Sequence, residues 1–102
     1  MSSKLVVMYP KPADPAHFDK HFRENHMPLV KKMPGLKSHS FGPVTGPDGG
    51  EGPYFWMFVG TFDSHQAIGA ALSSPEGQAA VADIPNYSPD GPTIAIIDST
   101  DG

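Results

Sequence analysis

One histidine, His26, lies where an imidazole could move a proton. It follows Phe22 by one helical turn, on the side of a predicted helix that also carries Phe18 and Leu29, and Met27-Pro28 comes directly after it. An imidazole with a pKa of about 6.5 can act as general base or general acid at neutral pH. A histidine in the last turn of a helix can also bond a free carbonyl and gain from the helix dipole. We predict that His26 is catalytic and keep this structural role as the alternative.

Aromatic side chains and a second histidine could line a space beside His26. The predicted substrate-binding residues are Tyr9, Phe22, His39 and Trp56. An aromatic wall suits a planar, fairly apolar ligand. The alternatives are that the aromatic rings belong to the core or to a dimer contact, and that His39 lies at a sheet edge.

Neither a metal nor a cofactor is predicted. His17, His21 and Glu24 have the spacing to chelate a metal from one helix face, but they lie at the edge of the solvent side, and we favour an exposed polar stripe over a metal site. No glycine-rich phosphate-binding pattern and no GxSxG motif occurs in the sequence. The absence of cysteine excludes disulfides, thiolate metal sites and cysteine nucleophiles.

The charge and the apolar runs of the sequence limit the kinds of partner that the protein is expected to bind. The net charge is -4, and the seven Lys and Arg residues form no cluster, so a nucleic-acid surface is disfavoured. The apolar run near the start, Leu5 to Met8, is shorter than a signal peptide core or a membrane span. We therefore expect a cytoplasmic protein that binds a small molecule and contacts neither nucleic acid nor membrane.

The sequence has twelve prolines and eleven glycines, and twenty of these 23 residues lie in five blocks that separate the elements that would position the candidate site residues. Strands are predicted over residues 4–9, 36–44, 54–62 and 93–97, and a hairpin loop of uncertain order over 42–53. A first helix begins at Asp14-Pro15 and should kink or stop near His26, because Pro28 lacks an amide hydrogen. A second begins at Asp63 or Ser64 and restarts at Ser74-Pro75.

This order of elements, βαββαβ, predicts one α+β domain over residues 1–102 with a ferredoxin-like antiparallel sheet. Helices cover only one face of such a sheet, yet the first, third and fourth predicted strands are apolar on both faces. An uncovered apolar face of that size exceeds what monomers normally expose. We therefore predict a homodimer joined through the open sheet faces.

Four segments resemble the EthD-like family, named for ethyl tert-butyl ether degradation. They are KLVVMYP from Lys4, FDKHFRENHMPLVKKMPGL from Phe18, the third predicted strand and SPEGQAAVADI from Ser74. The most specific match is His26-Met27-Pro28-Leu29 with Pro34-Gly35-Leu36. The resemblance implies a ferredoxin-like protomer that pairs into a dimeric α/β barrel, with His26 as the pocket histidine. It also implies a place in the breakdown of xenobiotic or aromatic compounds.

Two functions are consistent with these features. The first is a cofactor-independent enzyme of the monooxygenase, isomerase or dehydratase class, in which His26 takes a proton next to a carbonyl or phenol. The second is a non-catalytic binding or accessory protein that supports a partner oxygenase. An open apolar cavity reached by His26 and a second polar group would favour catalysis, whereas a filled interior would favour the accessory role.

Overall fold

Four antiparallel strands form the sheet of this protein, whose computed structural model describes residues 2–100. They are β1 (Ser2–Tyr9), β2 (Ser38–Thr45), β3 (Glu51–Phe62) and β4 (Thr93–Ser99), in the spatial order β2-β3-β1-β4. The chain is thus an α+β protein with the predicted ferredoxin-like topology, in which the first strand lies between the third and the fourth.

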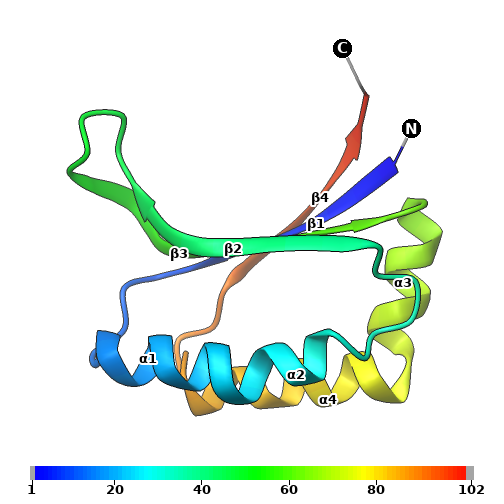
Figure 1. Ribbon diagram of the computed structural model, residues 1–102, viewed down its shortest axis with the longest axis horizontal. Helices are drawn as coiled ribbons and strands as arrows, with labels where there is room; N and C mark the ends of the chain where they lie inside the picture. Colours follow the sequence, from blue (N-terminus) through cyan, green and yellow to red (C-terminus); the bar gives the residue numbers. More distant parts are fainter. Residues whose placement is uncertain (1, 101–102) are drawn as a thin grey trace.

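The helices lie on one side of this sheet (Figure 1). The first connection contains α1 (Pro15–His21), a π-helical turn η1 (Phe22–His26) and α2 (Met27–Val30), and the second contains α3 (His65–Ser73), α4 (Pro75–Asp83) and the short 3-10 turn η2 (Ile84–Asn86). Asp14, Ser64 and Ser74 cap α1, α3 and α4 by accepting a hydrogen bond from a backbone amide of the first turn. None of the helices in residues 2–100 is long and apolar enough to cross a membrane.

We expected the first helix to kink or stop near His26, and the structure excludes the stop, because the chain passes Pro28 through an irregular turn without leaving the helix. The amide of Met27 bonds the carbonyl of Phe22, five residues earlier, and the helix continues to Val30. Pro28 has no amide hydrogen to donate. One wide turn directly before it shifts the hydrogen-bond pattern by a residue, so the chain passes the proline with a local change of geometry.

The hairpin between β2 and β3 is shorter than predicted. Both strands run into the predicted loop segment 42–53, and the turn itself is closed by the amide of Gly46, which donates to the carbonyl of Gly50. Gly49 has a φ of 83°, which a residue with a side chain rarely adopts. A register shift between Pro43 and Thr45 interrupts the ladder near the turn.

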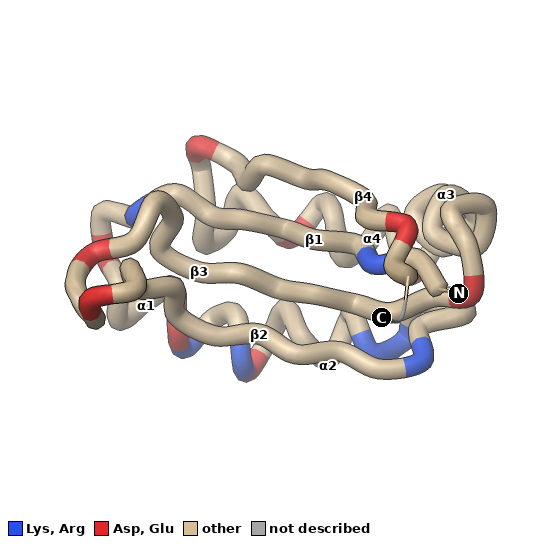
Figure 2. Tube along the Cα trace, turned by 90° about the horizontal axis from the view of Figure 1, so that it is seen from above, with Lys and Arg blue, Asp and Glu red and all other residues tan. Residues whose placement is uncertain are grey.

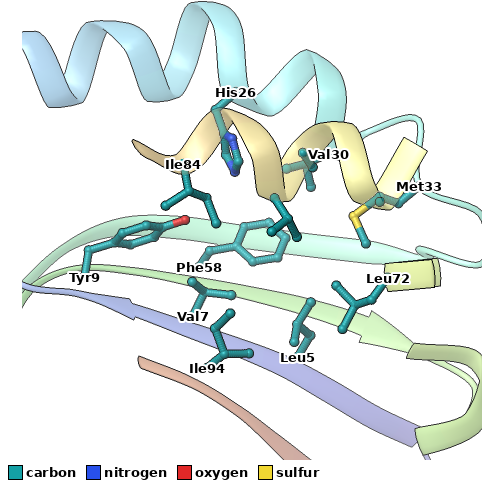
Figure 3. A pocket seen from close by; sticks show the side chains of 13 residues that line it. Leu5, Val7, Tyr9, His26, Val30, Met33, Phe58, Leu72, Ile84 and Ile94 are labelled. Carbon is teal, nitrogen blue, oxygen red and sulfur yellow. The ribbon is translucent and has the colours of Figure 1, made fainter. Parts of the chain in front are cut away.

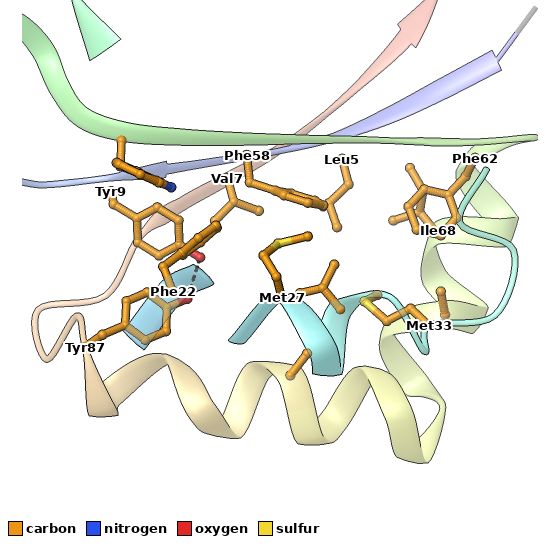
Figure 4. Close-up of a cluster of buried hydrophobic side chains, with 14 of the residues drawn as sticks. Leu5, Val7, Tyr9, Phe22, Met27, Met33, Phe58, Phe62, Ile68 and Tyr87 are labelled. Carbon is orange, nitrogen blue, oxygen red and sulfur yellow. Dashed lines mark hydrogen bonds between the residues drawn. The ribbon is translucent and has the colours of Figure 1, made fainter. Parts of the chain in front are cut away.

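The core lies between the sheet and the helices (Figure 4). Alternate residues of β1 and β3 point toward the helices and are buried, and helix residues pack against them from the opposite layer. The largest fully buried side chains are Tyr9, Phe18, Phe22, Trp56, Phe62 and Ile68.

The other side of the sheet is apolar and lies away from the helices. Val6 pairs with Val59 and Met8 with Met57 across β1 and β3, and all four are only partly buried, while Ile97 of β4 is 52% exposed. Figure 2 shows that the charged residues lie on the helices and near the strand ends, whereas the central parts of the strands carry none. This face has the composition of a contact surface.

One glycine sets how closely α3 and α4 approach. A Cβ at Gly77 would lie 2.0 Å from the carbonyl oxygen of Ala71, which is backbone and cannot turn aside. Gly69, also helical, has open space at the same place.

We therefore expect Gly77→Ala to destabilise the fold by about 1–3 kcal/mol, although alanine is the better helix former. Gly69→Ala is the matched control and should stabilise it by about 0.5–1 kcal/mol. Urea unfolding of the two variants measures the change in the free energy of unfolding, which should have opposite signs in the two. Equal effects would show that the helix contact at Gly77 is not tight.

Candidate functional site

A small apolar cavity lies between the sheet and the helices (Figure 3). Its floor is formed by Leu5, Val7 and Phe58 of the sheet and its roof by helix residues such as Val30 and Ala80. Val81 of α4 and Ile94 of β4 also line it and are 45% and 49% exposed, so they mark its opening. The cavity volume is about 40 Å³. A single water needs about 10–15 Å³, so a group of a few heavy atoms fits.

His26 is the ionisable group on the roof of this cavity. Its side chain is 6% exposed, and its Nδ1 lies 3.0 Å from Oδ2 of Asp83, at the end of α4. Because an ionised carboxylate only accepts hydrogen bonds, Nδ1 carries the hydrogen and Nε2 keeps a lone pair. Within residues 2–100 no hydrogen bond to Nε2 is found. The arrangement therefore has the components of a general base and of the group that orients it.

Burial lowers the pKa of His26, and the hydrogen bond and the charge of Asp83 oppose that effect only in part. A protonated His21 would lower this pKa further, because it is a like charge nearby. The net direction is downward from 6.5. His26 is therefore neutral at pH 7, which is the state that a base needs.

Asp83 stays ionised in this environment. Burial by itself would raise its pKa, but hydrogen bonds from Asn86, His21 and His26 outweigh that effect and the pKa lies below its ordinary value. The Nε2 of His21 lies 2.8 Å from Oδ1, and Nδ2 of Asn86 lies 3.0 Å from the same oxygen. Three side chains thus hold one carboxylate.

Tyr9 supplies the second polar group at the cavity and is hydrogen-bonded there to Tyr87, which does not line it. Tyr9 lines it from β1, and its hydroxyl lies 2.8 Å from that of Tyr87, which is buried beside the rings of His21 and His26. Burial raises the pKa of Tyr9 to about 12 and raises that of Tyr87 as well, so both remain protonated phenols. In Figure 3 the Tyr9 hydroxyl and the His26 ring point into the same space from opposite sides.

The other predicted binding residues, Phe22, Trp56 and His39, lie outside the lining of this cavity. Phe22 is buried, and its ring centre lies 5.2 Å from that of His26, so it supports the histidine from behind. Trp56 is buried among Phe18, Phe22 and Phe41, and its Nε1 has no hydrogen-bond partner among residues 2–100. His39 is exposed on the edge strand β2. Tyr9 and His26 therefore share the cavity, whereas Phe22, Trp56 and His39 do not line it.

Of the three residues with metal-ligand spacing, the two histidines make hydrogen bonds to other residues. His17 contacts the carbonyl oxygen of Asn86 through Nε2, and His21 bonds Asp83. His21 is only 16% exposed, so it is not part of the solvent stripe that we considered. In the described part of the chain no three His, Asp or Glu side chains are grouped as metal ligands.

Sequence reasoning missed Asp83 and Tyr87. Asp83 is 57 residues from His26 in the chain, and Tyr87 lies in a proline-rich loop. No local pattern relates either residue to the histidine. The one available signal was an aspartate near the C-terminal end of the helix that restarts at Ser74-Pro75, where a negative charge meets the unfavourable end of the helix dipole and so needs another partner.

A family model described as the EthD domain matches residues 10–90. An 11.0 kDa protein of the thcB–thcC intergenic region of Rhodococcus erythropolis is 36% identical over 95 residues, which cover 93% of this chain and 92% of that protein. The crystal structure of an ethyl tert-butyl ether degradation (EthD) family protein from Bacillus halodurans is similar with a TM-score of 0.90 at 29% identity, and covers 98% of this chain and 100% of that one.

Two more distant structures share the fold. One is a dimeric ferredoxin-like protein from Jannaschia, with a TM-score of 0.73 at 20% identity, covering 97% of this chain and all of that one. The other is SnoaB, a cofactor-independent oxygenase from Streptomyces nogalater, with a TM-score of 0.71 at 15% identity, covering 99% and 95%. The family model and the Rhodococcus relative each span most of the sequence, and the chain belongs to the EthD domain family.

Proposed function

We propose that this protein binds the reactive end of a small, apolar carbonyl or phenol compound and removes a proton from it with His26. The observation that carries the proposal is the hydrogen bond between Nδ1 of the buried His26 and Asp83 at the roof of an otherwise apolar cavity. Pairing with a carboxylate fixes the ring and leaves Nε2 as the acceptor. Water is largely excluded from such a cavity, which strengthens every charge interaction inside it.

In this mechanism the proton moves from the carbon next to the carbonyl, or from the phenol oxygen, to Nε2 of His26. The imidazole becomes an imidazolium whose Nδ1–H remains bonded to Asp83, and the carboxylate offsets the new positive charge. The electron pair of the broken bond moves onto the substrate oxygen as an enolate or a phenolate. The positive charge gained by the histidine thus equals the negative charge gained by the substrate.

Tyr9 is the group that would stabilise this oxygen. When Tyr87 donates its hydrogen to Tyr9, the Tyr9 hydroxyl keeps its own hydrogen free for a ligand in the cavity. The pKa of about 12 keeps Tyr9 in the donating form. A phenol donor aimed at a developing oxyanion is a recurring source of rate enhancement.

The cavity size supports a ligand that is only partly enclosed. About 40 Å³ admits the reacting group, and the remainder of the molecule lies against Val81 and Ile94 at the opening. The apolar character of these two residues favours a hydrocarbon or aromatic remainder.

The reaction class proposed is cofactor-independent. An enolate or phenolate can be reprotonated elsewhere, which is isomerisation, can expel a hydroxide, which is dehydration, or can react with molecular oxygen as co-reactant, which is oxygenation. The shared fold of SnoaB is compatible with the last of these. The EthD domain match and the likeness to the Bacillus protein of the ethyl tert-butyl ether degradation family support a role in xenobiotic degradation.

The open sheet face supports a homodimer. Its apolar residues on β1, β3 and β4 would be covered by the same face of a second copy, as the self-complementary contact of a two-fold dimer requires. The similar fold of the dimeric Jannaschia protein supports this arrangement.

Catalysis can be tested without the natural substrate. Small ketones and phenols that raise the melting temperature would be selected first, and hydrogen–deuterium exchange beside their carbonyl would then be followed by NMR in D₂O. His26→Gln should slow the exchange by about 100- to 10,000-fold, since the base is lost. His65→Gln, an exposed histidine at the start of α3, is the control and should leave the rate unchanged. Ligand binding with no exchange in the wild type would support the accessory role instead.

The lowered pKa of His26 also predicts how stability depends on pH. Below about pH 6.5 the unfolded chain binds a proton at His26 that the folded chain does not, so the free energy of unfolding falls as the pH decreases toward the folded-state pKa. Denaturant unfolding at several pH values should show this decrease, and His26→Gln should reduce it. An unchanged pH dependence in the variant would contradict a buried, neutral His26.

The dimer can be tested by sedimentation. The wild type should sediment at twice the chain mass of 10.9 kDa at micromolar concentration. Val59→Lys places a charge in the middle of the open face and should shift the mass to that of one chain, because a buried unpaired charge is costly. Gln66→Lys, on the exposed side of α3, is the control. A wild-type mass near 10.9 kDa would refute the dimer.

A further inference from the structure

Asp83 is shared by two histidines of the same helix. Oδ1 of the carboxylate accepts from His21 at 2.8 Å, and Oδ2 lies 3.0 Å from Nδ1 of His26. The catalytic pair of the proposed function needs only one of them. His21 does not line the cavity and is the more exposed of the two, at 16% against 6%.

The π-helical turn explains how both rings reach one carboxylate. In a regular α-helix, residues five positions apart point about 140° away from each other. The η1 turn bonds residues five apart, from the Met27 amide to the Phe22 carbonyl, which brings position 26 close to the side of position 21. His21 and His26 therefore face α4 together. Such turns occur frequently at functional sites.

Asp83 faces both rings, and the other polar groups that face them are tyrosines, an asparagine and a histidine. His26 faces Asp83 from α4, Tyr87 beyond η2, and Tyr9 from β1. His21 faces the same Asp83 and Tyr87, with Asn25 beside its Nδ1 and His17 one turn earlier. Within residues 2–100, Asp83 is the acid that pairs with either histidine.

We propose that His21 is a positioning residue that keeps His26 unprotonated, by competing with it for the single negative charge of Asp83. When His21 carries a proton, its ion pair with Oδ1 neutralises the carboxylate. A proton on His26 then gains less from Asp83 and is repelled by the neighbouring cation. The base consequently stays free to a lower pH than it would in a pair made only of His26 and Asp83.

This role of His21 rests on the proposed function, because it assumes that His26 acts as a base. The test does not depend on that function. The ring nitrogens of the histidines would be followed by NMR across a pH series in the intact chain without any ligand. His21→Gln keeps a side-chain N–H for Oδ1 and cannot take up a proton. The pKa of His26 should shift upward in this variant, because the competing charge is gone.

His17→Gln is the matched control. His17 lies in the same helix, with its ring centre 5.7 Å from that of His21, but bonds the Asn86 carbonyl and not Asp83. It should leave the titration of His26 unchanged. His21→Asn removes the same charge and provides the comparison again if the glutamine variant does not fold. An unchanged or lowered pKa of His26 in the folded His21 variants would overturn the proposal.

The exchange assay separates this inference from the proposed function. If wild-type protein exchanges a ketone hydrogen, the acid limb of the pH–rate profile should move to higher pH in His21→Gln, with the rate at the alkaline plateau retained. If no compound exchanges, the proposed function fails while the NMR shift of His26 still decides the role of His21.

Discussion

The bond between Nδ1 of His26 and Asp83 joins the two helical connections of the fold at the place where they roof the cavity. A carboxylate that is largely removed from water must be compensated by hydrogen bonds, because an unpaired buried charge is strongly unfavourable. Asp83 receives these bonds from His21, His26 and Asn86. The bond from His26 also decides which ring nitrogen faces the cavity. The same hydrogen bond therefore compensates the charge of Asp83 and orients the proposed base.

The two faces of the sheet have different roles. The face toward the helices carries the core and the cavity, with Tyr9 pointing toward the space that His26 enters from above. The opposite face carries Val6, Met8, Met57 and Val59, which are apolar although no helix of the described chain lies over them. Strands that are apolar on both sides serve both faces at once, since successive side chains point in opposite directions.

The cavity itself is small, and this bears on the chemistry. Its walls are almost entirely aliphatic and aromatic, so the polar atoms that reach it, from His26 and Tyr9, meet little competition from water. A base on one side and a phenol donor on the other suit a proton transfer that leaves negative charge on oxygen. The π-helical turn before Pro28 contributes to this arrangement, because it places His21 and His26 on the side of the helix that faces α4.

Alternation, proline positions and capping residues predicted the order of strands and helices and the ferredoxin-like class, and helical spacing singled out His26, because such patterns act over a few neighbouring positions. Which residues surround that histidine depends instead on how the folded layers pack. In the folded protein Asp83, 57 residues away in the sequence, bonds His26. His39 lies exposed on an edge strand, and Trp56 is buried in the core. The helix also continues past Pro28, where the loss of one amide is absorbed by a wide turn. Contacts between distant segments depend on how two layers pack, and local sequence patterns contain no record of that packing.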